Sequence, residues 1–147
     1  YLGDVARAKK VLSELDKHYP ESTKYEVAGF LWWQGDKDRY NAAHSAMYGK
    51  NLKQLFKALR KEFNAPKAKM VVATLGQTNK EKANGNEKLI IDGMLAFGDS
   101  CKGEAAVVYT NPISMGSSSN AHYGANAKTY MNVGLAMGEA MVKLIQK

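Results

Sequence analysis

Hydrophobic residues recur along the chain in two patterns, one with the period of a helix and one that forms short unbroken runs. In the first pattern apolar residues follow one another at steps of three and four, as in Val5, Ala8, Leu12 and Leu15, which is the spacing of one helix face. This pattern predicts four helices, at about Asp4–His18, Met47–Phe63, Glu87–Phe97 and Asn126–Ile145. The unbroken runs predict three strands, at Tyr25–Trp33, Lys69–Leu75 and Ala105–Tyr109.

The alternation of helices and strands predicts the class of fold. The connections are long enough for parallel pairing, so we expect an α/β fold in which a parallel sheet carries helices on both faces. Tyr25–Trp33 is continuous and rich in aromatic residues, which favours a central strand covered on both faces. Ligands of such sheets bind at the loops after the carboxyl ends of the strands. We therefore look for chemistry in the loops that begin at Gln34, Gly76 and Thr110.

Composition and charge narrow the classes of function. A chain of 147 residues fits one domain. The formal net charge of +7 comes from lysines spread along the predicted helices, which favours solvated helix faces over a nucleic-acid site, and no nucleic-acid partner is expected. No apolar run approaches the roughly 20 residues of a membrane span. Cys101 is the only cysteine, and neither His18 nor His44 has a metal-ligand partner at a suitable spacing, so we predict no disulfide, no metal and no cofactor.

The loop after the first predicted strand combines an amide, a glycine and an acid. Gln34 could aim an amide donor at a developing oxyanion, and Gly35 permits a tight turn with close backbone approach. Asp36 could orient a histidine or cap the turn. The alternative is a polar loop in which Asp36 and Asp38 form ion pairs with Lys37 and Arg39.

The loop before the last predicted helix contains the segment Ser117–Gly124, with His122 inside it. This histidine is expected at the ligand edge of the sheet and not on an apolar helix stripe. It could therefore act as a general base that takes a proton from a nucleophilic hydroxyl. The alternative is a surface histidine without a catalytic role.

Two further segments imitate nucleophile motifs. Gly98-Asp99-Ser100 copies the opening of the GDS(L) serine motif, but it follows a predicted helix where that motif follows a strand. Gly76-Gln77-Thr78-Asn79 resembles a Gly-Gln-Ser-Asn nucleophile turn and follows a strand, but threonine stands in the place of serine. Both are interpreted as coincidences, and a threonine nucleophile at Thr78 is the alternative.

The order of these features resembles that of a known group of enzymes. The segment Tyr25–Asp36, with Trp32-Trp33-Gln34-Gly35-Asp36, is similar to the Trp-x-Gln-Gly-Glu block of the sialate O-acetylesterase and acetylxylan esterase group of SGNH hydrolases. The segments Tyr48–Pro66 and Val71–Gly76 fit the helix and strand that follow in bacterial members. Asn120–Tyr130 resembles the block that holds the family histidine, so the resemblance covers nearly the whole chain.

This resemblance implies a three-layer α/β/α flavodoxin-like fold and hydrolysis of O-acetyl esters on carbohydrates by a Ser–His mechanism. His122 would then be the base, and Gln34 with Gly35 would help to form the oxyanion pocket. Trp33 and Asn120 are the expected substrate contacts. Many members carry an acid three residues before the histidine, but that position is Ser119 here, which leaves a carbonyl, Asn120 or Asp36 to orient His122.

The resemblance also implies a missing part. The family serine follows a strand upstream of the Trp-Gln-Gly block, whereas only one predicted helix precedes that block here. We therefore expect 1–147 to be a single partial esterase domain, truncated at the N-terminus and inactive without the serine. Relatives are often exported by bacteria, so a periplasmic or secreted parent fits the resemblance, but the sequence itself does not name the compartment. The alternative function is a non-catalytic carbohydrate-binding or scaffold domain of the same fold.

Overall fold

A computed structural model describes the backbone of residues 1–21, 24–116 and 119–146, with all of their side chains except those of residues 119–121. Its strands are β1 (Gly29–Trp32), β2 (Lys69–Ala73) and β3 (Ala105–Val108). The α-helices are α1 (Leu2–Ser13), α2 (Leu15–His18), α3 (Ala42–Glu62), α4 (Gly85–Ser100) and α5 (Ala127–Ile145). Three short 3-10 helices complete the elements, η1 (Asp38–Tyr40), η2 (Asn111–Ile113) and η3 (Ser119–Ala125). Within these ranges the predicted alternation of helix and strand is confirmed.

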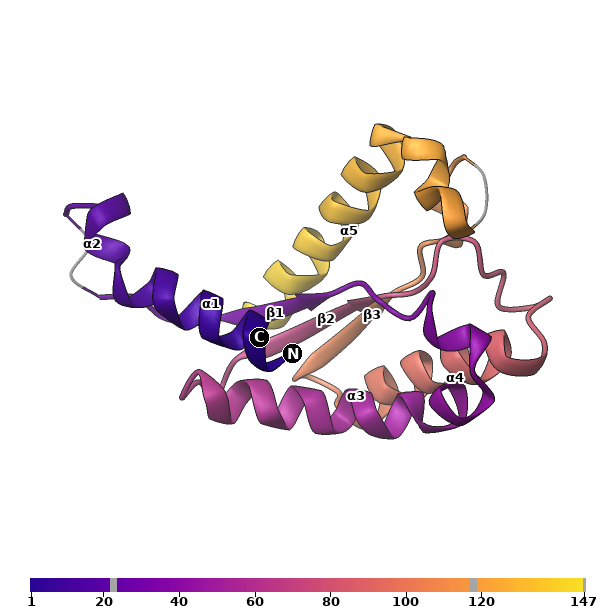
Figure 1. Cartoon of the computed structure of the whole chain (residues 1–147), viewed down its shortest axis with the longest axis horizontal. Helices are drawn as coiled ribbons and strands as arrows, with labels where there is room; N and C mark the ends of the chain where they lie inside the picture. Colours follow the sequence, from indigo (N-terminus) through magenta and orange to yellow (C-terminus); the bar gives the residue numbers. More distant parts are fainter. Residues whose placement is uncertain (22–23, 117–118, 147) are drawn as a thin grey trace.

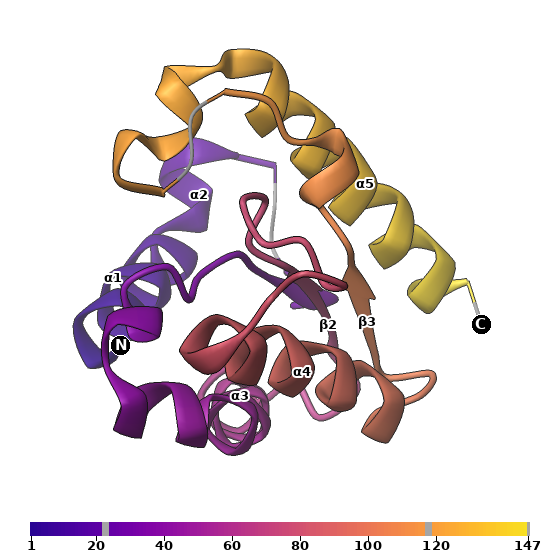
Figure 2. The ribbon, with the colours of Figure 1, turned by 90° about the vertical axis from the view of Figure 1, so that its right-hand side faces the viewer.

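The described strands form one parallel sheet in the order β1-β2-β3. Helices α3 and α4 lie on one face of this sheet and α5 lies on the other (Figures 1 and 2). The predicted α/β fold with helices on both faces is therefore confirmed. Within the described residues, no helix combines the length and the apolar character that crossing a membrane would need.

Strand β2 forms the centre of the core because its side chains alternate between the two faces. Met70 and Val72 pack under α3 and α4, whereas Val71 and Ala73 pack under α5, and all four are fully buried. Burial of a side chain of this size stabilises the fold by about 1.5–3 kcal/mol. The unbroken apolar run of β2 thus reflects contact with both helical layers, as expected from the sequence.

Helices α3 and α4 approach each other closely where two glycines meet. A Cβ atom built on Gly49 would lie 3.0 Å from the Cα of Gly93, and one built on Gly93 would lie 3.0 Å from the backbone nitrogen of Gly49. Any larger side chain at either position would force the helices apart. Both helices also contact η1, in the loop that follows β1.

The prediction for the first strand was wrong in two respects. Regular pairing is confined to Gly29–Trp32, and within the described residues β1 lies at the edge of the sheet and not at its centre. Leu31 is 57% exposed, whereas its partner in the register, Val71, is fully buried. An apolar run shows that a strand can bury both of its faces. It does not show whether the described chain contains a second strand to pair with it.

Other boundaries also differ from the prediction. The first expected helix is two helices, α1 and α2, because the backbone leaves the helical region at Glu14 with φ −113° and ψ 23°. Helix α3 begins five residues earlier than expected, at Ala42, where the Asn41 side chain accepts a hydrogen bond from the His44 amide. Helix α4 is longer than expected at both ends. These shifts leave the order of the elements unchanged.

Candidate functional site

The carboxyl ends of the strands are joined by hydrogen bonds between the loops that follow them. Thr110, two residues after β3, donates its hydroxyl to the carbonyl of Thr74 over 2.6 Å, and its amide donates to the Thr74 hydroxyl over 3.0 Å. Asn111 donates its side-chain amide to the carbonyl of Gly76 over 2.8 Å. Thr74 and Thr110 are fully buried, so these bonds satisfy polar groups that water does not reach. These hydrogen bonds therefore hold the loops after β2 and β3 together at the ligand edge of the sheet.

The loop after β1 directs the Gln34 side chain toward η1 and α3, away from these hydrogen bonds. The Gln34 side-chain amide donates to Asp38 over 2.5 Å, and its backbone carbonyl accepts the Tyr48 hydroxyl over 2.6 Å. Gly35 is buried with φ 135°, a conformation that favours glycine. A Cβ there would lie 3.2 Å from both the Met94 methyl carbon and the Tyr48 hydroxyl. One amide hydrogen of Gln34 remains for another acceptor, because the other is bound to Asp38.

Asp36 is the meeting point of two loops. Its Oδ1 accepts the Gln77 side-chain amide over 2.6 Å and lies 2.9 Å from Nε of Arg39. An ion pair between Asp36 and Arg39, which belongs to the alternative interpretation of this loop, is therefore present. Arg39 also lies 3.8 Å from Glu87, which accepts the hydroxyl of Thr78 over 2.6 Å. These polar contacts tie the loop after β1 to the loop after β2 and to the first turn of α4.

His122 lies in a run of left-handed backbone before α5. His122, Tyr123, Gly124 and Ala125 have φ values of 43°, 59°, 61° and 54°. Each non-glycine residue in this region costs about 1–3 kcal/mol, so such a run persists only where other contacts hold it. Tyr123 supplies one of these contacts, since its hydroxyl accepts the Gly76 amide over 3.0 Å. The same hydroxyl donates to Oε1 of Gln77 over 3.0 Å.

Three aromatic rings pack together beside this run. Trp33 stacks on Tyr123 with ring centroids 5.6 Å apart and an interplanar angle of 17°. Tyr130, in the first turn of α5, forms T-shaped contacts with both rings, with centroid distances of 5.5 Å to Trp33 and 6.1 Å to Tyr123. Burial raises the pKa of the Tyr123 phenol above its ordinary value of 10.0. The phenol is therefore neutral at physiological pH and able to donate to Gln77.

The structure brings some of the predicted site residues together. Asp36 reaches Tyr123, the neighbour of His122, through Gln77, whereas Gln34 is bound on the side of α3. The His122 side chain is exposed, and within the described part of the chain its imidazole makes no hydrogen bond or ion pair. The predicted substrate contact Asn120 lies in η3, and its side chain is outside the described residues, as is that of Ser119.

Sequence reasoning missed Gln77, Tyr123 and Arg39 as site residues. Gln77 lies in the loop after a buried strand, four residues beyond β2 at the ligand edge, which is a signal that could have found it. Its contacts to Asp36 and Tyr123 span 41 and 46 residues. Spacing along the sequence does not predict contacts over such a separation.

The two segments that imitate nucleophile motifs, at Thr78 and Ser100, have other structural roles. Thr78 is 1% exposed and its hydroxyl donates to Glu87, so it is closed off from a substrate. Ser100 ends α4 and donates to the carbonyl of Phe97 over 2.9 Å. The carboxyl end of α4 leads into the amino end of β3, which is the edge of the sheet opposite to the site. Among the described residues, no group of three His, Cys, Asp or Glu side chains could hold a metal ion.

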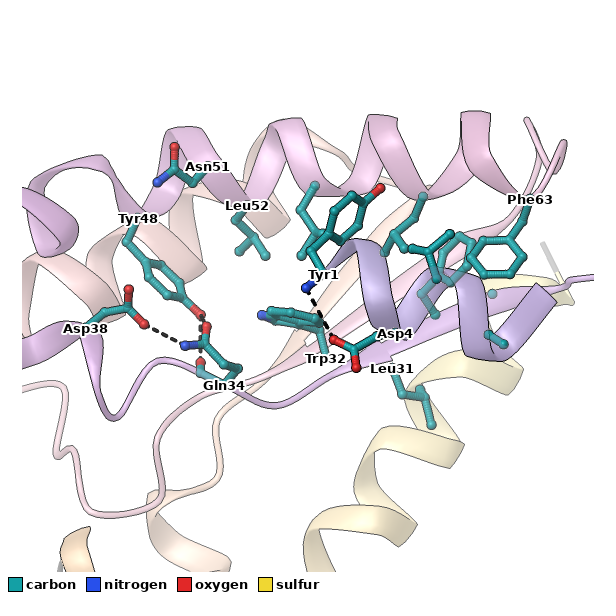
Figure 3. A pocket seen from close by; sticks show the side chains of 16 residues that line it. Tyr1, Asp4, Leu31, Trp32, Gln34, Asp38, Tyr48, Asn51, Leu52 and Phe63 are labelled. Atoms are coloured by element: carbon teal, nitrogen blue, oxygen red, sulfur yellow. Dashed lines mark hydrogen bonds and ion pairs between the residues drawn. The ribbon is translucent and has the colours of Figure 1, made fainter. Parts of the chain in front are cut away.

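A groove of about 550 Å³ lies along β1, on the face that α3 covers (Figure 3). Its walls come from α1, β1 and α3, and most of them are apolar, with Val5, Phe30, Leu52, Leu55, Leu59 and Phe63. Gln34, Asp38 and Tyr48 form its polar end, next to the loop after β1. The groove therefore runs along the free edge of the described sheet and ends at a candidate site residue.

The family model described as "Carbohydrate esterase, sialic acid-specific acetylesterase" matches residues 4–143. The fold is similar to an X-ray structure of a protein from Arabidopsis thaliana, with a TM-score of 0.62 and 21% sequence identity. The match covers 90% of this chain and 52% of that protein, so the chain spans about half the length of the solved structure. The comparison with curated proteins gives no match. Together, the family match and the solved structure fit an SGNH-like α/β fold.

Proposed function

Because the chain belongs to the carbohydrate esterase family of sialic acid-specific acetylesterases, we propose that it forms part of an enzyme that removes O-acetyl groups from sugars. In this proposal His122 is the general base, and the serine nucleophile comes from polypeptide outside the 147 residues. The family match supports a carbohydrate esterase kind of function and an acetylated carbohydrate as substrate. The assignment of His122 rests on its exposed position before α5, at the ligand edge of the sheet.

The proposed reaction has two acyl-transfer steps. The serine oxygen attacks the acetyl carbonyl carbon while His122 accepts the hydroxyl proton. The sugar oxygen then leaves with that proton, and an acetyl-serine remains. A water molecule, deprotonated by His122, attacks the acetyl-serine, and acetate leaves as the serine oxygen regains the proton. An imidazole with access to solvent can serve both steps.

Three hydroxyls near this edge support a nucleophile from outside the chain, because each is bound to another group. Thr78 donates to Glu87, Thr110 donates to the carbonyl of Thr74, and Ser114 donates to the carbonyl of Thr110. The unpaired edge of β1 and the apolar groove along it are what a further parallel strand would need. A strand in that place would deliver its carboxyl end beside the loop that holds Gln34.

The remaining predicted residues have proposed roles that fit their contacts. Gln34 would donate its second amide hydrogen to the developing oxyanion, and Gly35 allows the loop to approach the reacting group. Asp36 would keep the loops after β1 and β2 together through Gln77. Trp33 and Asn120 would contact the sugar, Trp33 through the part of its ring that Tyr123 and Tyr130 leave uncovered.

The proposal is tested by measuring acetate release from O-acetylated sugars by two proteins. One is the 147-residue chain and the other is the longest natural polypeptide that contains it. We expect turnover by the longer polypeptide alone. His122→Gln in that polypeptide should lower kcat by about 10²- to 10⁴-fold, which is the usual contribution of a general base.

His18→Gln is the matched control, since His18 is an exposed histidine at the end of α2, and its activity should equal that of the wild type. Full activity of His122→Gln would contradict the role of His122. Turnover by the 147-residue chain would contradict an external nucleophile. If the longer polypeptide binds acetylated sugars without releasing acetate, the alternative of a non-catalytic carbohydrate-binding domain applies.

A further inference from the structure

The backbone around His122 is held by three aromatic side chains, that of its neighbour Tyr123 and those of Trp33 and Tyr130. Its φ of 43° and ψ of 57° belong to the left-handed region, as do those of Tyr123 after it. Left-handed residues other than glycine are unfavourable alone, so the surroundings must fix them. The groups that do so decide where the imidazole points, because φ and ψ set the direction of the Cα–Cβ bond.

The first of these groups is the Tyr123 phenol, which anchors the residue after His122. Its hydroxyl accepts the Gly76 amide and donates to Gln77, each over 3.0 Å. Because Gln77 in turn donates its amide to Asp36, the direction of each hydrogen bond is fixed. The anchor therefore joins the His122 segment to the ends of β1 and β2.

The second and third groups are rings that contact Tyr123 and each other. Trp33, the residue after β1, stacks on Tyr123 at 5.6 Å. Tyr130 packs against both rings and donates its hydroxyl to the carbonyl of His122 over 3.1 Å. His122 is thus tied through its own carbonyl and through the side chain of its neighbour, while its imidazole stays exposed.

We propose that Trp33, Tyr123 and Tyr130 form an aromatic cluster that positions His122. The inference rests on the proposed function in that His122 is the base, and it deepens it by naming the residues that place this base. Trp33, Tyr123 and Tyr130 are positioning residues and do not exchange protons with the substrate. The Tyr123 hydroxyl is the central group of the cluster, because it makes the bonds that reach the loop after β2.

The test removes that hydroxyl alone. Tyr123→Phe keeps the ring that stacks on Trp33 and leaves the Gly76 amide without its acceptor. In the 147-residue chain, hydrogen exchange at the Gly76 amide should become about tenfold faster, as expected for the loss of one hydrogen bond. The heteronuclear NOE of the His122 amide should fall at the same time. Exchange at Val72, in the centre of β2, should not change.

Tyr109→Phe is the matched control, because the Tyr109 hydroxyl also accepts a backbone amide, that of Lys80, over 3.1 Å. It should leave Gly76 and His122 unchanged. The inference is overturned if Tyr123→Phe leaves both signals unchanged. It is also overturned if exchange at Val72 rises by the same factor, since the hydroxyl would then act on the whole fold. Neither result depends on catalysis, so both stand whether or not the proposed function holds.

A kinetic readout completes the test in the longer natural polypeptide. Tyr123→Phe should lower kcat by about ten- to a hundredfold, as expected for a displaced catalytic group, and should leave KM within about twofold. A rise in KM with unchanged kcat would overturn the inference and assign Tyr123 to substrate binding.

Discussion

The side-chain amide of Gln77 donates to the carboxylate of Asp36 over 2.6 Å, which joins the loop after β2 to the loop after β1. The same Gln77 accepts the Tyr123 hydroxyl through its oxygen. Gln77 thus uses a donor on one side and an acceptor on the other, and only an amide offers both in this shape. A change of one atom at this position is therefore a sensitive probe of the site.

Gln77→Glu replaces the donor with a second carboxylate oxygen next to Asp36. The hydrogen bond is lost and two like charges face each other, so the free energy of unfolding should fall by about 1–3 kcal/mol at pH 7. The loss should shrink below about pH 4, where carboxylates become protonated. Urea denaturation at both pH values measures the effect.

Gln54→Glu serves as the control for Gln77→Glu, because Gln54 is exposed on α3. Its effect should stay within about 0.5 kcal/mol. Equal effects of the two variants at pH 7 would mean that the contact between Gln77 and Asp36 contributes no stability.

Leu31 and Val71 are register partners on neighbouring strands, and they differ in what covers them. Val71→Ala should lower the free energy of unfolding by about 2 kcal/mol, since it removes buried methyl groups and leaves a cavity under α5. Leu31→Ala removes more atoms, but at a side chain that is 57% exposed, and should cost under about 1 kcal/mol. Urea denaturation of the 147-residue chain decides between them. A larger cost for Leu31→Ala would mean that β1 is covered in solution.

The same two residues explain what the sequence could and could not predict about the fold. The apolar run of β2 predicted a buried strand correctly, because both helical layers that cover it lie within the chain. The run of β1 has the same character, yet within the described residues β1 has one strand neighbour. Hydrophobic pattern states how much surface a strand can bury. It does not show which helix or strand will cover that surface.

The candidate site was predictable where residues follow the strands directly. Gln34 and Asp36 were found because they come directly after an apolar run that leads to the ligand edge. The partner of Asp36 was not found, because Gln77 lies 41 residues further along the chain. The left-handed backbone at His122 was also not predicted, since the Tyr123 and Gly76 that hold it are 47 residues apart. Local sequence patterns do not predict contacts between residues so far apart in the chain.

Gly35 is a glycine of the site whose backbone conformation favours glycine. With φ 135° and close neighbours in Met94 and Tyr48, Gly35→Ala should lower the free energy of unfolding by about 1–3 kcal/mol. Gly3→Ala is the control, because Gly3 lies in α1 with open space around it, and alanine there should be neutral or stabilising. Thermal unfolding followed by circular dichroism measures both. A neutral Gly35→Ala would contradict the tight turn.

Tyr48 lies at the polar end of the groove, where its hydroxyl donates to the carbonyl of Gln34 over 2.6 Å. The ring is 6% exposed, and this burial raises the pKa of its phenol above the ordinary value of 10.0. Burial raises the pKa of Tyr123 as well. In both residues folding favours the neutral phenol, so the unfolded chain releases these protons at a lower pH than the folded chain does.

Stability should therefore fall with rising pH, beginning above about pH 10. The contribution of a raised pKa is complete below the unfolded value and is lost as the pH rises through the folded value. Urea denaturation between pH 8 and pH 11.5, with short incubations, should give a free energy of unfolding that declines over the upper part of this range. Tyr48→Phe should be less stable at pH 8, because the Gln34 carbonyl loses its donor, and should decline less steeply above pH 10. A wild type and a Tyr48→Phe variant with parallel pH profiles would mean that the Tyr48 phenol ionises as readily in the folded chain as in the unfolded one.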